Sequence, residues 1–324
     1  MPFTLSHAAA VLPAVRRDGT GRGPLVPAVL VAGSFAPDMT FYAANVLPGG
    51  MEFGTFTHAF AGVFTVDVLI SWALVGLWLL VREPLTALLP RGLQGRPAVL
   101  LRCGAPRARV RAVCVVWWYV SAVLGALTHV VWDAFTHEGR WGTRLIPAIE
   151  RDRPAGLPLF AWLQYGSSVV GVVVIAVFTA RALRRGPGEE AVGGPTGAPP
   201  GVSLGAAPSV PMLSARDRWV AGVVIGGAAA AGAVQRAARS WAVMGAPRRL
   251  WDLVPALCFG AGAGLVLGVV LYAAGVRLWR PDRAPDGPAG PRGPGGPGGP
   301  GLRDPGPGDR RGVVGADRER PVGR

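Results

Sequence analysis

The chain has 324 residues, of which half are hydrophobic and only 16% are charged, and its formal net charge is +14. A basic balance of this kind can mark a nucleic-acid partner, but the chain has no lysine and its arginines lie between apolar runs or towards the carboxyl end. That distribution is typical of membrane proteins, and we expect no nucleic-acid binding. The three cysteines are scattered without a C-x-x-C pair, which argues against a thiolate zinc site and a disulfide framework.

The first elements expected along the chain are short. Thr4–Val15 is apolar but no basic residue precedes it, so it is not an ordinary signal peptide and favours a short helix instead. Leu25–Phe35 is also apolar, yet it is too short to cross a bilayer. We interpret it as a re-entrant or interfacial segment.

Longer apolar runs follow, and they reach the roughly 20 residues that a spanning helix needs. The sequence therefore predicts an all-α fold, a polytopic membrane helical bundle with about five transmembrane helices. The expected spans are Ala59–Val81, Val110–Val131, Leu159–Ala180, Trp219–Gln235 and Val254–Val276. The fourth is the shortest of them and is rich in Gly and Ala.

Composition divides the chain into four predicted regions. A membrane domain with every histidine covers residues 1–185, and a Gly/Pro/Ala-rich flexible linker covers 186–217. A two-helix membrane extension covers 218–279, and a disordered Gly/Pro/Arg-rich tail covers 280–324. Arginine counts place the loop after the first span, and with it the tail, in the cytoplasm. We expect a multi-pass protein of the cell (inner, cytoplasmic) membrane.

The second span ends in the most informative motif of the sequence. His129, Asp133 and His137 are spaced i, i+4, i+8, which puts imidazole, carboxylate and imidazole on one face of a helix. Ionisable groups are costly at a membrane edge, so they favour a functional interpretation. His137 can also lie beyond the end of the helix, in which case the spacing no longer aligns it.

Topology brings further polar groups to the same side of the membrane. His58 begins the first span, and Gln164, Tyr165, Ser167 and Ser168 begin the third. His7 on the short first helix and Asp38, after a turn with Gly33 and Pro37, can join them. Each has a simpler alternative: His7 as a surface or capping residue, Asp38 as a turn residue, and His58 as an interfacial one.

Taken together, His7, Asp38, His58, His129 and Asp133 are the predicted metal ligands. Imidazoles with one or two carboxylates suit a divalent metal, zinc first and manganese or iron(II) as alternatives. Asp133 and His137 are the candidate catalytic residues, with His137 as a further ligand or a proton shuttle. Asp67, near mid-membrane in the predicted first span, is expected to pair with an arginine or to orient a ligand.

Other catalytic signatures are missing from the sequence. It contains no G-x-S-x-G elbow, which argues against a serine hydrolase of that type. It contains neither a phosphate-binding loop nor a dinucleotide fingerprint, so no organic cofactor is expected.

Several segments together resemble a family of bacterial, mostly actinobacterial, membrane proteins that is described only as a domain of unknown function. The matching segments are MPFTLSHAAAVLP at 1–13, VAGSFAPD at 31–38, TH at 57–58, GALTHVVWDAFTH at 125–137 and LQYGSS at 163–168. That family is similar to membrane-bound metal-dependent hydrolases, and more distantly to zinc-dependent phospholipase C. The chain departs from the hydrolase pattern, because no arginine lies just before Thr57 and no second Asp or His follows Asp38.

The resemblance and the ligand chemistry lead to one hypothesis with two alternatives. The protein is expected to be a metal-dependent hydrolase that acts on a lipid or phosphoester at the membrane surface, with membrane lipid as its partner. The first alternative is a non-enzymatic structural or interaction protein, in which the polar cluster holds helices together. The second is a small transporter that uses Asp67 and the histidines as an ion path.

Overall fold

The computed structural model describes residues 4–103, 112–184, 210–244 and 253–279. Contacts divide the chain into two units, Met1–Asp282 and Arg283–Arg324, and the description below concerns the first. Over the described ranges the elements are helices, joined by turns and one isolated bridge between Val15 and Gly21, which confirms the all-α prediction. The predicted linker up to residue 209 and the predicted tail lie outside these ranges.

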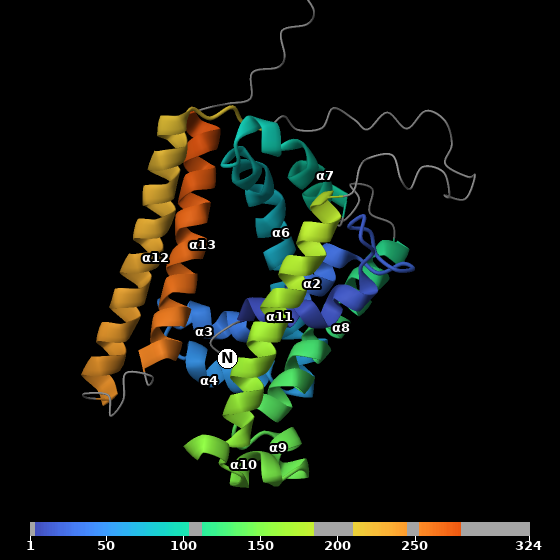
Figure 1. Cartoon of the computed structure of the whole chain (residues 1–324), viewed down its shortest axis with the longest axis vertical. Coiled ribbons are helices and arrows are strands. Elements are labelled where there is room, and N and C mark those ends of the chain that lie inside the picture. Colours follow the sequence, from blue (N-terminus) through green and yellow to red (C-terminus); the bar gives the residue numbers. More distant parts are fainter. Residues whose placement is uncertain (1–3, 104–111, 185–209, 245–252, 280–324) are drawn as a thin grey trace, which may run out of the picture. The chain divides into compact units, whose positions relative to one another are not determined.

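Five helices in the described part of the chain are long and apolar enough to cross a membrane, as predicted (Figure 1). Three of them precede residue 185, and two follow residue 214. Their bounds are α6 Val66–Ala87, α8 Ala112–Thr136, α11 Leu159–Arg184, α12 Ala215–Met244 and α13 Val254–Trp279. A multi-pass membrane protein accounts for the many apolar side chains that these helices expose.

The first spanning helix differs from the prediction of Ala59–Val81. A short helix, α5 (Phe60–Phe64), comes first, and the backbone of Thr65 then leaves helical geometry, with φ −127° and ψ −87°. The long helix α6 starts only at Val66 and continues to Ala87. Asp67 therefore lies in the first turn of α6 rather than near mid-membrane. The helix dipole favours a carboxylate at this amino-terminal position.

The segment before α5 folds into short helices that pack against the long ones. The predicted helix at Thr4–Val15 is present in three pieces, and the segment Leu25–Phe35 forms a buried nine-residue helix. These elements are η1 Thr4–His7, α1 Ala8–Val11, η2 Leu12–Ala14, α2 Pro27–Phe35, η3 Ala36–Asp38, α3 Met39–Ala43 and α4 Gly50–Thr57.

Two glycines bring α2 into direct backbone contact with α8. A Cβ atom on Gly33 would lie 2.5 Å from the carbonyl oxygen of Ala122, and one on Gly125 would lie 2.3 Å from that of Leu30. A larger residue at either position would push the helices apart. Around this contact, Val29, Val63 and other apolar side chains of α2, α5, α6 and α8 form a buried core.

The remaining short helices connect the spans. They are η4 Arg91–Leu93 and α7 Gly95–Cys103 after α6, and α9 Trp141–Leu145, α10 Ala148–Arg151 and η5 Pro154–Gly156 before α11. Arg102 of α7 donates two hydrogen bonds, of 2.8 and 2.7 Å, to the carboxylate of Glu83 near the end of α6. This pair ties α7 to the end of α6 that lies away from Asp67.

The last two spans, α12 and α13, form a closely packed pair that is visible side by side in Figure 1. Glycine allows the two helices to pack closely, since a Cβ atom on Gly264 would lie 2.0 Å from the carbonyl oxygen of Ala228. Helix α12 is longer than the predicted Trp219–Gln235, because it continues through Arg236 and Arg239, whose side chains bond to backbone carbonyls of the segment after α3. Tyr272 of α13 donates to the carbonyl of Pro84 in α6.

Candidate metal centre

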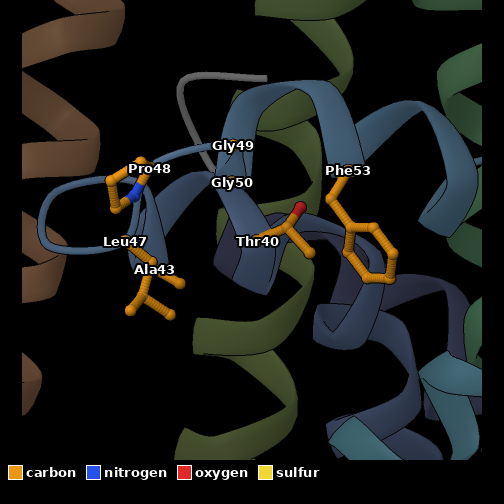
Figure 2. Close-up of a pocket in the computed structure, with 7 residues that line it drawn as sticks. All are labelled: Thr40, Ala43, Leu47, Pro48, Gly49, Gly50 and Phe53. Atoms are coloured by element: carbon orange, nitrogen blue, oxygen red, sulfur yellow. The ribbon is translucent and has the colours of Figure 1, made fainter.

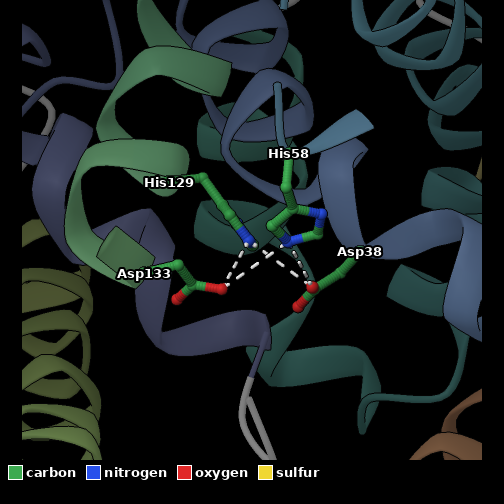
Figure 3. A group of neighbouring side chains, drawn as sticks. All are labelled: Asp38, His58, His129 and Asp133. Atoms are coloured by element: carbon green, nitrogen blue, oxygen red, sulfur yellow. Dashed lines mark ion pairs between the residues drawn. The ribbon is translucent and has the colours of Figure 1, made fainter. Parts of the chain in front are cut away.

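Four side chains from three separate parts of the chain converge in the interior (Figure 3). Asp38 ends η3, His58 follows α4, and His129 and Asp133 lie one turn apart on α8. Each offers one nitrogen or oxygen atom, and these four atoms lie within 4.8 Å of one another. All four residues are buried, so the cluster is able to hold a metal ion away from bulk water.

The spacing of these atoms matches the spacing of ligands around one ion. Nε2 of His58 lies 3.4 Å from Oδ1 of Asp38 and 3.6 Å from Oδ2 of Asp133. Nε2 of His129 lies 3.4 Å from each of the same two oxygens. A charge-assisted hydrogen bond would be about 2.7–2.9 Å. Tetrahedral ligands at about 2.05 Å from zinc lie about 3.3–3.4 Å apart, which is close to these four distances, while the two remaining pairs of ligand atoms lie within 4.8 Å.

Backbone carbonyls fix the tautomer of both imidazoles. Nδ1 of His129 lies 2.8 Å from the carbonyl oxygen of Ser34, and Nδ1 of His58 lies 2.8 Å from that of Gly54. A carbonyl only accepts, so each Nδ1 carries the proton and donates. The unprotonated Nε2 of each ring then faces the cluster, as in metal-binding histidines whose second nitrogen is held by an outer hydrogen bond.

The contact between α2 and α8 explains how these groups meet. Gly33 and Gly125 allow α2 to lie against α8, and this places the Ser34 carbonyl beside His129. The short helix η3 continues α2 and ends at Asp38, so the carboxylate reaches the same face of α8. Asp38 was expected in an open turn, but it lies in a 3-10 helix.

A hydrogen-bond chain holds the Asp38 carboxylate in one orientation. The Thr4 hydroxyl donates to Oδ2 of Asp38 over 2.6 Å, and the Tyr42 hydroxyl donates to Thr4 over 3.0 Å. Thr57 donates to the carbonyl of Pro37 over 2.8 Å, which ties the residue before His58 to the helix that carries Asp38. Oδ2 is thus engaged, and Oδ1 faces the cluster.

His7 lies beside the four residues and completes the predicted ligand set. Its ring stacks on that of His129, with centroids 3.8 Å apart, and its Nε2 lies 3.4 Å from Oδ1 of Asp133. His7 is fully buried, and neither of its ring nitrogens has a hydrogen-bond partner among the described residues. The same holds for Oδ1 of Asp38, Nε2 of His129 and Oδ1 of Asp133. Buried polar atoms without partners are rare, and an absent cation is one explanation for such a group.

His137 borders the cluster but is the most accessible of the histidines. Helix α8 ends at Thr136, so His137 lies just past it, as considered from the sequence. Its Nδ1 is 3.6 Å from Oδ1 of Asp133, and its side chain is 24% exposed. Its Nε2 contacts the side-chain amide of Gln164 on α11 at 3.1 Å.

The ionisation of the groups outside the spans is compatible with cation binding. Burial would raise the pKa of the Asp38 carboxyl, but the adjacent imidazoles of His129 and His58 hold it well below its usual range. Burial and the neighbouring His129 lower the pKa of His7 to about 4. Burial also lowers the pKa of His137 to about 4. At neutral pH the carboxylate is therefore charged, and these two rings are neutral and able to coordinate.

The pKa of His58 is shifted in the opposite direction to those of His7 and His137. Burial lowers its pKa, but the carboxylates of Asp133 and Asp38 outweigh burial and raise it above the ordinary value. Because the two carboxylates favour the protonated form, a proton and a cation compete for Nε2 of His58.

The other predicted polar residues lie around the cluster rather than in it. Gln164 reaches His137, Ser167 accepts a 3.0 Å hydrogen bond from Trp132, and Ser168 donates to the carbonyl of Gln164. Tyr165 is exposed. Asp67 is fully buried, does not belong to the four-residue cluster, and neither carboxylate oxygen has a hydrogen-bond partner within the described ranges. The expected arginine partner of Asp67 is therefore not found there.

Sequence reasoning missed the residues that support the ligands. The roles of Thr4, Tyr42, Thr57 and the carbonyls of Ser34 and Gly54 depend on contacts that join distant parts of the chain. Only Thr57 had a sequence signal, because it directly precedes His58.

Comparison with known proteins places the chain in one family. No curated protein and no solved structure matches it. A family model described as Domain of unknown function (DUF4184) matches residues 1–274, which include every residue of the cluster and all five long helices up to near the end of α13. The chain therefore belongs to this family of unknown function.

Proposed function

We propose that this protein is a metal-dependent hydrolase of the cell membrane that cleaves a lipid or another phosphoester at the membrane surface. The observation that carries the proposal is the convergence of two imidazole nitrogens and two carboxylate oxygens in a buried cluster, with neighbouring atoms 3.4–3.6 Å apart. A structural role alone would be served equally well by apolar packing, and buried ionic groups are costly without a cation or close hydrogen bonds.

The donor set favours zinc over other divalent ions. Two imidazoles and two carboxylates suit tetrahedral zinc, and manganese or iron(II) are alternatives with the same donor types. Asp38, His58, His129 and Asp133 would hold the ion. When bound, it would polarise a phosphoryl or ester oxygen and lower the pKa of a coordinated water.

His7 extends the set of candidate ligands. Asp133 faces His58 and His129 with Oδ2, and it faces His7 with Oδ1. A single carboxylate can therefore connect His7 to the four-residue cluster. His7 would serve either as a further ligand of the same ion or, together with Asp133, as a ligand of a second one.

His137 is the candidate proton-transfer residue. It combines partial exposure with a position next to Asp133, and Gln164 on a different helix holds its Nε2. A neutral imidazole at the edge of the cluster can accept a proton from an attacking water and return it to a leaving group. A carboxylate neighbour such as Asp133 favours the charged form while the proton is held.

The location of the cluster supports an amphiphilic substrate. The ligands lie at the carboxyl-terminal end of α8, at the end of η3 and between α4 and α5, where a spanning helix meets a layer of short helices. That layer exposes Phe53, Phe56 and Phe60. Exposed aromatic side chains at the end of a span are typical of the lipid–water boundary.

Metal analysis of the detergent-purified full chain tests the first half of the proposal. We expect about one divalent ion per protein in the wild type and loss of that ion in His129→Ala/Asp133→Ala. Asp67→Asn is the matched control, because it also changes a fully buried aspartate but one outside the four-residue cluster. Absence of metal from the wild type after purification and after incubation with zinc, manganese or iron(II) would overturn the proposal.

Turnover is measured separately on the metal-loaded protein. Phospholipid vesicles and a panel of soluble phosphodiesters serve as substrates, with product release followed over time. Hydrolysis by the wild type that disappears in the double variant supports the proposal. Stoichiometric metal without turnover on any substrate would favour a structural metal site instead.

Asp67 favours a second candidate function, ion transport. Its carboxylate is fully buried in a spanning helix, and neither oxygen has a hydrogen-bond partner among the described residues. Although Asp67 lies in the first turn of α6, unpartnered carboxylates in spanning helices often mark ion pathways. Proteoliposomes that show a cation or proton flux abolished by Asp67→Asn, with metal content unchanged, would support transport over hydrolysis.

A further inference from the structure

An apolar pocket lies at the turn between α3 and α4 (Figure 2). Its volume is about 310 Å³, and Ala43, Leu47, Pro48 and Phe53 supply most of its walls. Gly49 adopts a φ of +81°, which L side chains rarely adopt, and lets the chain turn sharply into α4. A pocket of this size is at the lower end of the range for small-molecule sites.

The pocket continues into an exposed apolar surface. Val46 is 78% exposed, Leu47 60% and Met51 48%, although all three are hydrophobic. Large exposed apolar patches mark sites of contact with lipid or another partner. Since α4 lies on the same side as the start of α6, this surface would meet the bilayer near the headgroup region.

Two arginines of α12 lie against the same turn. Arg236 donates to the carbonyl of Ala44 over 2.9 Å and lies 3.2 Å from the sulfur of Met51. Arg239 donates to the carbonyl of Asn45 over 2.9 Å. Ala44 and Met51, which Arg236 contacts, directly follow the pocket residues Ala43 and Gly50. Asn45, which Arg239 contacts, is the next residue after Ala44, so both arginines bind the turn that forms the pocket.

These guanidinium groups can accept an anion. Each carries five N–H donors, so donors remain after the contacts with the turn. Over the described ranges the ion pairs of arginine are those of Arg82 and Arg102 with Glu83, and neither Arg236 nor Arg239 is paired with a carboxylate. Glu52, the acidic residue of α4, is exposed and forms no ion pair with them there.

We propose that the α3–α4 turn and the end of α12 form a binding site for an anionic phospholipid. An acyl chain would occupy the apolar pocket, and the phosphate would be held by Arg236 and Arg239. Guanidinium groups bind phosphate through paired, charge-assisted hydrogen bonds. Basic pockets between spanning helices recognise anionic lipid headgroups in the same way.

This site explains features that the metal centre leaves unused. It gives α12 and α13 a role, since α12 supplies both arginines while α13 contributes Phe259, whose carbonyl accepts a hydrogen bond from Asn45 over 3.2 Å. It also explains why arginines occur at this end of α12. Lipid binding here involves no residue of the metal cluster and does not depend on hydrolysis.

Binding to the purified full chain tests the proposal. Delipidated protein in detergent is titrated with short-chain phosphatidylglycerol, short-chain phosphatidylcholine and inorganic phosphate, and bound lipid is counted by native mass spectrometry. We expect phosphatidylglycerol to bind at least about tenfold more tightly than phosphatidylcholine. Arg236→Gln/Arg239→Gln should lose about tenfold of that affinity or more.

Matched variants separate the site from general charge and folding effects. Arg184→Gln/Arg216→Gln removes the same charge from exposed positions outside the turn and should bind phosphatidylglycerol like the wild type. Ala43→Phe fills the pocket and leaves both arginines in place, so it should weaken the binding of both phosphatidylglycerol and phosphatidylcholine. His129→Ala/Asp133→Ala should retain lipid binding, so failure of the metal proposal would not affect this one.

Three results would overturn the proposal. Equal affinity of the wild type for the two lipids would show that the phosphate charge is not recognised. An equal loss in the control pair of arginine variants would show a nonspecific charge effect. Inorganic phosphate that binds as tightly as phosphatidylglycerol would show that the pocket holds no acyl chain.

Discussion

The hydroxyl of Thr4 gives the sharpest test of how the candidate metal centre is held. It donates a 2.6 Å hydrogen bond to Oδ2 of the fully buried Asp38, and it is itself 2% exposed. Thr4→Val keeps the shape of the side chain but removes this donor. The carboxylate would then be free to rotate away from the cluster, and the charge on Oδ2 would lose its partner.

The expected magnitude follows from the type of bond. Hydrogen bonds to charged groups contribute about 1.5–3 kcal/mol, which corresponds to about 10–150-fold in an equilibrium constant. Outer hydrogen bonds to metal ligands are worth about 10–100-fold in metal affinity. We therefore expect Thr4→Val to weaken divalent-metal binding by about 10–100-fold, measured by competition with a chromophoric chelator on detergent-purified protein.

Two further variants make the result specific. Thr4→Ser keeps the hydroxyl and should restore most of the affinity. Thr86→Val is the matched control, because Thr86 is also 2% exposed but donates only to the carbonyl of Arg82 within its own helix. Metal affinity of Thr4→Val within twofold of the wild type would refute the idea that this hydrogen bond orients Asp38.

Three other predictions follow from the same structure. Gly125→Ala should destabilise the protein by about 1–3 kcal/mol, because its Cβ would lie 2.3 Å from the Leu30 carbonyl oxygen; thermal unfolding should show no comparable loss for Gly76→Ala, where nothing lies within 4 Å. Metal affinity should fall as the pH drops through the raised pKa of His58 and level off above that pKa, because a proton competes with the ion for Nε2 of His58. A metal affinity that does not change between pH 5 and 8 would contradict this prediction. His137→Ala should retain metal but lose about 10²–10⁴-fold in turnover, whereas loss of the metal itself would make His137 a ligand.

The parts of the site that were predictable depend on local spacing or on topology. His129 and Asp133 share a helix face because they are four residues apart, and α8 includes both. His58 was expected at the start of the first span, but it lies before α5, and α6 starts only at Val66. It still meets His129 and Asp133, because consecutive spans bring neighbouring ends to the same side. His7 and Asp38 were expected there because His7 lies on the short first helix and Asp38 follows a turn with Gly33 and Pro37, and the structure places both beside Asp133 or His129.

The parts that were not predictable depend on single backbone positions and on long-range contacts. Residues 59–81 are almost uniformly apolar, so nothing in their composition reveals that Thr65 interrupts the helix. The bond between Thr4 and Asp38 joins residues 34 positions apart and leaves no periodic pattern in the sequence. The contacts of Arg236 and Arg239 with carbonyls of the α3–α4 turn likewise join residues 192 and 194 positions apart.

The close contact between α2 and α8 also sets an order of events during synthesis. Asp38 and the Ser34 carbonyl emerge from the ribosome about ninety residues before His129, which they must meet. The nine residues of α2 cannot cross the bilayer alone. Helix α2 therefore cannot reach its final position until α8 has inserted, because Gly33 packs against the backbone of α8 beside Gly125. Under the proposed function, metal binding would therefore be a late step of biogenesis, because the four-residue cluster forms only after α8 has inserted.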